Sequence, residues 1–483
     1  MHTMNNSVIV IGAGITGLVA AYTLRKTYPG KIVVLEGQPT IGGKIRTERS
    51  NGCLLELGPD TIHDRGGLAY SLLSELGLSQ DIVVPLQSGY SVLHKGSLHA
   101  VDSGIMGSLT GKAKAIWNTK AVSLTGKLRA VLGNLGSPSV NGVDISIADY
   151  GRARWGKEFS QIIVEPLLAG IHGGDSARLS MKALYPYLLS SNSQGKSPKP
   201  ISKSPAIFAL KNGLSSMVEE LKAHLPAESL KVGVRARSVG LTEAGDEVVV
   251  KLNDRTELKG DACIVTTPAN VAAQLVEKSL PEEASILSSI PFASTVVVTV
   301  AFPLNTKRHI PYGNGIIGTA SSRSPISACT WSSLKWRGRA PEEILLARCF
   351  LHPDTKEEYL SYSDEKLSAV VAQELQKILR TSIRPLFVQV KRWENAFPQY
   401  ELGHIEKVRR LKALEKNHSE LRFAGASFRG ASITSCINDA MRVAEQIEAT
   451  LAEVSTEKIN ITDRRGAYSP KPKHYKTEDL QNA

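Results

Sequence analysis

Three glycines near the start of the chain are spaced as a nucleotide-binding turn requires. Gly12, Gly14 and Gly17 follow the apolar run of residues 7–11, and a helix-like segment comes directly after them. In such a turn the first glycine allows a tight bend, the second lets the backbone approach a pyrophosphate, and the third lets the helix pack closely on the strand. The amide groups at the helix N-terminus then face the phosphates. The chemistry that this spacing predicts is the binding of a dinucleotide.

An acidic residue, Glu36, closes the second apolar run nineteen positions after Gly17. A carboxylate there accepts hydrogen bonds from ribose hydroxyls and repels a 2′-phosphate, so FAD or NAD fits the site and NADP does not. A glycine-rich turn without a ligand is the alternative. A strand, a helix and an acid in this order favour the nucleotide.

Residues 313–318 repeat the same glycine spacing, but they do not qualify as a second fingerprint. No strand pattern precedes them and no helix pattern follows them, so we expect a β-hairpin there.

One dinucleotide-binding motif predicts a single dinucleotide that stays bound while substrates exchange, which favours FAD. A flavoenzyme without an NAD(P)H site takes electrons from its own substrate, so an oxidase or dehydrogenase is expected. No hydrolase, metalloprotease or kinase motif occurs.

Other segments are expected to lie around this cofactor. Residues 53–61 are typical of a strand that ends in a Gly-Pro turn, and residues 262–268 of a buried strand closed by proline. Residues 421–433 predict a strand and a glycine turn, followed by a helix over 435–452. The N-terminus of this helix offers a second phosphate-facing position.

The rest of the chain predicts helices and a mixed domain. Residues 207–225 have helical spacing, and residues 231–252 predict two strands. Residues 294–390 alternate strands with one helix over 365–379, which is typical of an α+β domain. Residues 190–205 lack periodicity and are rich in Ser, Pro and Lys, so we expect an exposed loop.

Length and composition bound the class of protein. A chain of 483 residues predicts two or three domains. No run of eighteen apolar residues occurs and the first strand begins within ten residues of Met1, so we expect a cytoplasmic bacterial protein without a signal peptide. The five cysteines are scattered without CxxC spacing, which predicts neither disulfides nor a metal site.

The net charge of +12 is compatible with nucleic acid, an anionic membrane or a polyanionic small molecule. No aromatic-rich nucleic-acid motif occurs, so we expect no nucleic-acid partner. Within residues 111–135, Leu124, Leu128 and Leu132 repeat at helical spacing among lysines. We favour a core-facing helix with a solvated lysine face. A basic helix lying on a membrane surface is the alternative.

The sequence resembles the bacterial protoporphyrinogen and coproporphyrinogen III oxidases of the flavin amine oxidase superfamily. The resemblance extends from about residue 7 to residue 447. Its motifs are Glu36 with Gly42-Gly43-Lys44 and Arg46, residues 56–60, Thr266-Thr-Pro268, Gly425 with Gly430, and residues 164–175, 327–336 and 392–404.

The resemblance implies an α/β fold: a Rossmann-type FAD-binding domain, an α+β substrate domain and a helical insertion that touches membrane in some members. Combined with the element pattern, it predicts four parts of the chain. These are a discontinuous FAD-binding domain of residues 1–62, 206–275 and 415–452, a substrate domain of 276–414, the insertion of 63–205, and a polar tail of 453–483.

The implied reaction is oxidation of a porphyrinogen in haem biosynthesis, in three two-electron steps. Molecular oxygen is the implied acceptor and hydrogen peroxide the implied product. The protein mainly orients the macrocycle against the flavin, so no strong catalytic base is expected. We favour coproporphyrinogen III over protoporphyrinogen IX as substrate.

The resemblance also implies site residues. For FAD they are Gly12, Gly14, Ile15, Thr16, Gly17, Glu36, Gly42, Gly43, Lys44, Arg46, Gly58, Pro59, Ser238, Trp393, Gly425, Ser432 and Ile433. The catalytic pocket has Gly58, Pro59 and His172 as candidates. Substrate carboxylates need cations, for which the candidates are Arg65, Lys95, Arg152, Arg154 and Arg323.

This chain departs from the family pattern at several positions near the flavin. Ser432 and Ala440 stand where glycines are usual, and His172 replaces an aromatic residue. An amine oxidase or desaturase acting on a specialised substrate is therefore a second interpretation. A flavin-binding protein without catalysis is a third.

Overall fold

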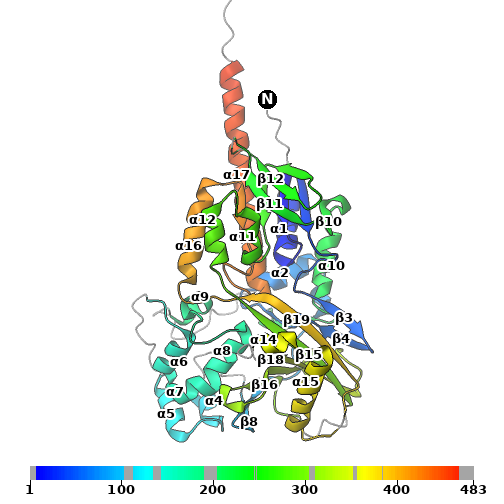
Figure 1. The fold of residues 1–483 in the computed structure, drawn as a ribbon, viewed down its shortest axis with the longest axis vertical. Coiled ribbons are helices and arrows are strands. Elements are labelled where there is room, and N and C mark those ends of the chain that lie inside the picture. The colour runs from blue at the N-terminus through cyan, green and yellow to red at the C-terminus, as the bar shows by residue number, and fades with distance from the viewer. Residues whose placement is uncertain are drawn as a thin grey trace, which may run out of the picture.

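The computed structural model describes residues 7–102, 113–133, 143–189, 204–243, 245, 247–303, 310–351, 356–382 and 384–466. A sheet with long helices forms one lobe of the molecule, and a second sheet with a group of helices beside it forms the other (Figure 1). Most of the loop predicted over 190–205, both ends of the helix predicted over 111–135 and the end of the polar tail lie outside the described residues.

The first lobe is built on a five-stranded parallel sheet with the strand order of a Rossmann fold. Its central strand is buried at every position, as expected where helices or other layers cover both faces of a parallel sheet. In spatial order the strands are β10 (Leu230–Val232), β2 (Lys31–Glu36), β1 (Ser7–Ile11), β14 (Ala262–Val265) and β20 (Leu421–Phe423).

Alternate residues of β1 face two different cores. Val8 and Val10 pack with helices α1 (Ile15–Thr27) and α17 (Ile433–Gly466). Ile9 and Ile11 pack on the other side, in a core shared with a three-stranded sheet and two helices. That second layer consists of β11 (Ala236–Leu241), β12 (Val248–Leu252), β13 (Glu257–Gly260), α11 (Ala269–Val276) and α12 (Pro281–Ser288). The predicted Rossmann-type α/β fold is therefore confirmed.

The second lobe contains a seven-stranded sheet. In spatial order its strands are β19 (Phe387–Pro398), β15 (Phe292–Pro303), β18 (Ile344–Leu351), β17 (Ile326–Trp331), β16 (Gly315–Gly318), β7 (Tyr90–His94) and β8 (Ser97–Val101). Neighbouring strands are antiparallel except for β16 and β7. Val296 and Val298 of β15 pack in a core with α15 (Asp364–Ile378). The β-hairpin expected at residues 313–318 is present as β16 with β17.

A helical group lies beside this sheet and includes α4 (Ala113–Asn118), α5 (Leu124–Gly133), α6 (Ile147–Trp155), α7 (Lys157–Phe159) and α8 (Glu165–His172) (Figure 1). The core-facing orientation predicted for the leucines of α5 is wrong. Leu124 is 69% exposed, and Leu128 and Leu132 are each 54% exposed. The buried positions are Gly126 and Ala130, because small residues let α5 approach its neighbours closely.

Several other segments differ from the sequence-based expectations. The helix predicted over 207–225 begins only at Ser215, where α10 (Ser215–Ala223) starts, and residues 207–210 form strand β9 (Ile207–Leu210) instead. Strand β9 pairs with β5 (Ile62–His63) and β6 (Ile82–Val83), so this apolar stretch is used in a small sheet. Helix α17 continues to Gly466, into the segment expected to be a polar tail. Among the helices of the described residues, none is long and apolar enough to cross a membrane.

A stacked pair of rings joins the two lobes. The ring of Tyr400 lies 3.9 Å from that of His404 at an angle of 13°. The Tyr400 hydroxyl accepts from the Gly430 amide at 2.7 Å and donates to the Ala426 carbonyl at 2.8 Å. His404 Nε2 lies 3.1 Å from the Phe428 carbonyl oxygen. Burial lowers the pKa of His404 to about 4, although the hydrogen bond to Phe428 acts in the opposite direction.

We therefore predict that His404 makes folding stability depend on pH. In the unfolded chain a histidine titrates near 6.5, so below that pH the unfolded state binds a proton that the folded state does not. The free energy of unfolding falls as the pH drops from about 6.5 toward 4, by about 3 kcal/mol at most from this residue. Urea midpoints at pH 7 and pH 4.5 measure the loss.

The variant His404→Gln should lose less stability over this pH interval than the wild type. His224→Gln is the matched control, because His224 is an exposed histidine that follows α10. An unchanged pH dependence in His404→Gln would contradict the assignment.

Candidate functional site

A continuous cavity of about 2030 Å³ runs between the two lobes. Its wall begins at the glycine turn after β1, passes Gly58 and Pro59, and ends among residues of β7, β8, α7 and α8. A single small-molecule pocket has a volume of about 300–1,000 Å³. The cavity is therefore large enough for a cofactor and a separate substrate.

The glycine turn has the geometry of a phosphate cradle. A Cβ on Gly17 would overlap the carbonyl oxygen of Gly12, so this position requires glycine for close packing of α1 on β1. Gly14 is different: its φ is −73°, which any residue adopts, and a Cβ there meets no atom within 4 Å. Nothing in the described part of the protein requires glycine at this position. A side chain would instead fill the space at the N-terminus of α1, where a pyrophosphate is expected.

Glu36 lies at the end of β2 and lines the cavity. Its Oε2 accepts from the Ala13 amide at 2.9 Å, and its Oε1 accepts from the Gln38 amide at 2.8 Å. These bonds fix the orientation of the carboxylate and leave lone pairs for ribose hydroxyls. The residues present thus fit a dinucleotide.

The structure brings most of the predicted cofactor residues to the cavity. Those that line it are Gly12, Gly14, Ile15, Thr16, Glu36, Gly42, Gly43, Lys44, Gly58, Pro59, Trp393, Ser432 and Ile433. Four others are not part of the wall: Gly17, Arg46, Ser238 and Gly425. Gly425 acts behind the wall, where its amide donates to the buried carboxylate of Asp439 at 2.8 Å. Arg46 hydrogen-bonds to the hydroxyl of Thr40.

Sequence reasoning missed the segment of residues 234–237, which lines the cavity beside Glu36 in place of Ser238. The Val234 amide donates to the Glu36 carbonyl at 2.9 Å, which holds this segment along the end of β2. The available signal was the short strand β10, because it pairs in parallel with β2 and leads directly into Val234.

The middle of the cavity is shaped by main chain. A Cβ on Gly58 would overlap the carbonyl oxygen of Lys44, so no side chain fits there. Trp393 Nε1 donates to the Leu57 carbonyl at 2.7 Å and holds the same turn from the other lobe. Ser432 Oγ accepts from the Ser435 amide at 3.0 Å and so caps α17 at its N-terminus. The Ser432 side chain therefore has a structural role.

The far end of the cavity combines polar and apolar groups. His172 lines it, with Nε2 2.9 Å from the Tyr185 hydroxyl, and burial lowers the pKa of His172 to about 4. His172 is thus neutral at physiological pH. Lys95 lines this end, together with three residues that the sequence did not single out: His94, His99 and Lys157.

The other candidate cations are not part of the cavity wall. Arg154 is 3% exposed, and its guanidinium donates to the Tyr150 hydroxyl at 2.7 Å. Arg152 pairs with Glu165 at 3.3 Å. Arg65 and Arg323 likewise lie outside the residues that line the cavity.

Comparisons with known proteins identify relatives of this arrangement. The family model described as flavin containing amine oxidoreductase matches residues 15–448. The chain is 30% identical over 452 residues to the coproporphyrinogen III oxidase of Bacillus subtilis (strain 168), covering 89% of this chain and 95% of that protein. The coproporphyrinogen III oxidase of Staphylococcus aureus is 28% identical over 468 residues, 93% of this chain and 100% of that protein.

A solved structure agrees with these matches. A protein from Exiguobacterium sp. 255-15, assigned as a protoporphyrinogen oxidase, superposes with a TM-score of 0.80 at 26% identity. The superposition covers 93% of this chain and 100% of that one.

The two glycines of the turn give a paired prediction. Gly14→Ala should fold normally and lose bound dinucleotide, because its Cβ enters the phosphate cradle and meets no protein atom. We expect at least about a tenfold weaker affinity, which corresponds to about 1.4 kcal/mol. Cofactor content after gel filtration and the melting temperature of the apoprotein measure the two effects.

Gly17→Ala is the contrasting variant. Its Cβ overlaps the Gly12 carbonyl, so we expect a lower melting temperature even without cofactor. If Gly14→Ala keeps its cofactor with unchanged affinity, the cradle does not hold a pyrophosphate.

Proposed function

The chain belongs to the flavin containing amine oxidoreductases and to their bacterial porphyrinogen oxidase branch, and on that premise we propose that it oxidises coproporphyrinogen III to the porphyrin in haem biosynthesis. The proposal includes FAD as the flavin, molecular oxygen as the acceptor and hydrogen peroxide as the second product. Protoporphyrinogen IX is the alternative porphyrinogen.

The observation that carries the proposal is one continuous cavity that joins the glycine turn to a far end among β7, β8, α7 and α8, which we call the chamber. The cavity volume of about 2030 Å³ exceeds what one ligand needs. Gly14 would hold the phosphates of FAD and Glu36 its adenosine, and Gly58 and Pro59, farther along the same wall, would then lie beside its ring. This direction supports direct contact between the flavin ring and a large substrate.

The chamber wall supports an anionic, flat substrate. Lys95 lies in the turn between β7 and β8, and Lys157 begins α7; both line the cavity. Glu158 and Glu165 line the same end, but Glu158 is hydrogen-bonded to Ser123 and Glu165 is paired with Arg152. Coproporphyrinogen III carries four propionates, whereas protoporphyrinogen IX carries two propionates and two vinyl groups. Cations at the far end favour the substrate with more carboxylates. Apolar side chains such as Ile171, which is 51% exposed, offer a surface for the macrocycle.

A bound flavin would supply two-electron oxidation: it would accept the hydride from a methylene bridge of the porphyrinogen while a pyrrole nitrogen releases a proton, and it would pass the electron pair to oxygen, which with two protons gives hydrogen peroxide. The chain's own residues bind and orient the macrocycle. His172 holds no proton on its second nitrogen at neutral pH, since burial lowers its pKa to about 4. It therefore serves as a neutral wall group beside Tyr185.

Anaerobic mixing of the purified flavoprotein with coproporphyrinogen III tests this function. We expect loss of the oxidised-flavin absorbance before oxygen is admitted, followed by porphyrin fluorescence and peroxide on aeration. Three peroxide molecules should form per porphyrin. If the protein binds flavin but its oxidised-flavin absorbance does not fall with either porphyrinogen, the proposal is overturned and another substrate is favoured.

The cationic residues allow a matched comparison. Lys95→Met and Lys157→Met should raise KM for coproporphyrinogen III by about tenfold, the equivalent of one lost charge-assisted contact, and raise KM for protoporphyrinogen IX less. Lys251→Met is the control, because Lys251 is an exposed lysine on β12 outside the cavity wall. Equal effects on both substrates would argue against carboxylate recognition here.

We further propose that α4 and α5 make peripheral contact with an anionic membrane surface. On α5, Leu124 is 69% exposed and begins a row that Leu128 and Leu132 continue, and on α4 Trp117 is 50% exposed. Exposed cations, among them Lys114, lie on the same two helices. An apolar row with flanking lysines is the pattern of an interfacial helix.

Vesicle sedimentation tests the membrane contact. The wild type should bind vesicles containing phosphatidylglycerol more tightly than neutral phosphatidylcholine vesicles, and the double variant Leu128→Ser/Leu132→Ser should lose about tenfold in affinity. Leu386→Ser is the control, because Leu386 is 56% exposed and outside this row. Wild-type binding that is equally weak to both vesicles would contradict the proposal.

A further inference from the structure

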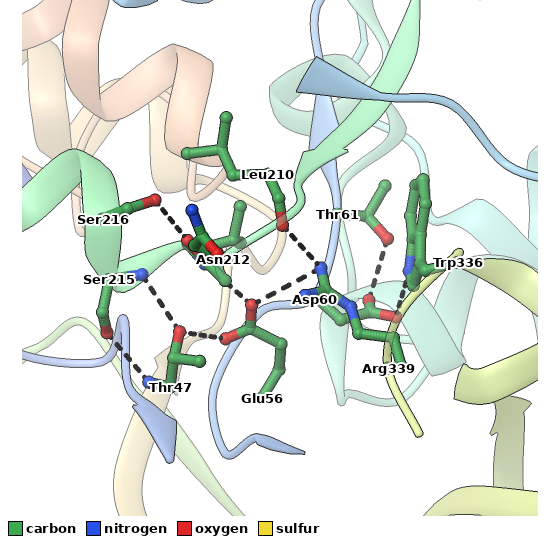
Figure 2. Close-up of polar contacts among 12 residues, drawn as sticks. Thr47, Glu56, Asp60, Thr61, Leu210, Asn212, Ser215, Ser216, Trp336 and Arg339 are labelled. Atoms are coloured by element: carbon green, nitrogen blue, oxygen red, sulfur yellow. Dashed lines mark hydrogen bonds and ion pairs between the residues drawn. The ribbon is translucent and has the colours of Figure 1, made fainter. Parts of the chain in front are cut away.

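A group of buried charges lies behind the Gly58-Pro59 turn. The Asp60 carboxylate is 3.3 Å from Lys335 Nζ and 3.8 Å from the Arg348 guanidinium. The three side chains are only 14%, 13% and 5% exposed, respectively. Asp60 also accepts from Trp336 Nε1 at 3.4 Å and from the Thr61 hydroxyl at 2.8 Å (Figure 2).

A second pair extends the group away from the cavity. Arg339 lies 3.8 Å from Glu56, and both side chains are almost fully buried. Glu56 accepts from the Thr47 hydroxyl at 2.8 Å, and Arg339 donates to the Leu210 carbonyl at 3.0 Å (Figure 2). In this pair both carboxylate oxygens of Glu56 accept hydrogen bonds, whereas Nε and Nη1 of Arg339 have no hydrogen-bond partner among the described residues. Neither residue lines the cavity.

The charges of this group do not cancel. Lys335, Arg339 and Arg348 supply three positive charges, whereas Glu56 and Asp60 supply two negative ones. Burial on its own would raise the pKa of Asp60, but Lys335 and Arg348 outweigh it and hold that pKa well below its usual range. Asp60 is therefore ionised, and a surplus of positive charge remains. Uncompensated buried charge is costly, so it favours an anion nearby.

The surplus faces the cavity. Lys335, Arg348 and Asp60 all line it, next to Gly58 and Pro59. Arg348 donates to the Gly58 carbonyl, and its Nε finds no acceptor among the described residues. His63, which also lines the cavity, lies within electrostatic reach of Lys335 and Asp60, and the buried thiols of Cys329 and Cys349 lie within reach of Arg348.

This stretch of wall is where the flavin ring lies in the proposed function, on which the inference rests. Two-electron reduction leaves the flavin ring anionic unless it takes up a second proton. A positive charge in a site of low dielectric constant stabilises that anion more strongly than it would in water.

We propose that the Lys335–Asp60–Arg348 cluster sets the reduction potential of the flavin: its surplus positive charge stabilises the anionic reduced ring, and Asp60 limits the size of that surplus. The three residues act through space and need not touch the substrate. Their effect is thus a property of the bound cofactor alone.

The reduction potential of the bound flavin, measured without any porphyrinogen, tests the proposal. Lys335→Met removes one positive charge, so the equilibrium constant for reduction should fall at least about tenfold, or about 30 mV for a two-electron couple. Asp60→Asn removes the negative charge, so the potential should rise by a similar amount. Structural damage alone would move both variants in the same direction.

Sulfite binding gives a second readout on the same variants, because sulfite forms an anionic adduct with oxidised flavin. Its dissociation constant should rise about tenfold in Lys335→Met and fall in Asp60→Asn. Lys335→Arg keeps the charge and should resemble the wild type, as should Lys251→Met at the exposed position on β12. Flavin content reports on each variant's cofactor site.

Shifts of the same sign in Lys335→Met and Asp60→Asn, or no shift in either, would overturn the inference. A wild-type protein that retains no flavin would instead overturn the proposed cofactor. If the reduction potentials shift as expected but no porphyrinogen is oxidised, only the proposed substrate is contradicted. The three failures are therefore distinguishable.

Discussion

The close approach of helix α1 to strand β1 is the constraint on which the cavity depends. Gly17 packs against the Gly12 carbonyl with no room for a Cβ, and Thr266 Oγ1 lies 2.8 Å from the Ile11 carbonyl and 3.0 Å from that of Gly12. The N-terminus of α1 is thereby held at the carboxyl edge of the sheet. Gly14 then faces open space, and the amide groups around it supply positive potential to that space. A side chain at Gly17 would displace the helix, and one at Gly14 would fill the cradle.

The segments that complete the cavity are irregular, so side chains must satisfy their backbone groups. The buried carboxylate of Asp439 accepts from the Gly425 amide, and Tyr400 accepts from the Gly430 amide at the other end of the same loop. Trp393 and Arg348 do the same for the turn at Leu57 and Gly58. Asp439 comes from α17 of the first lobe, whereas Arg348, Trp393 and Tyr400 lie on or directly after strands β18 and β19 of the second. The backbone groups of the cavity wall therefore find their hydrogen-bond partners only when both lobes are in place.

The nucleotide half of the site could be predicted because its determinants are local. The spacing of Gly12, Gly14 and Gly17 and the position of Glu36 follow from one strand, one turn and one helix. Beside Glu36 the sequence predicted Ser238, but residues 234–237 line the cavity there. Their place is set by the pairing of β10 with β2, which the local sequence does not show. For the far end, charge identifies candidate cations but not the side of the fold that they face. Lys95 lines the cavity and Arg323 does not, although both have positive φ in turns.

The leucines of α5 mark another limit of periodicity. Spacing of four residues places Leu124, Leu128 and Leu132 on one face, but it does not say which way that face points. The orientation of α5 is set by its opposite face, where Gly126 and Ala130 let the helix pack closely against its neighbours. Because α5 packs against the protein through these small residues, the leucines on its other face remain largely exposed. Leu128 and Leu132 still bury nearly half of their surface against the protein, and only the exposed remainder of this row adds nothing to the stability of the folded chain. An exposed apolar row of this kind is what a contact with another surface would use.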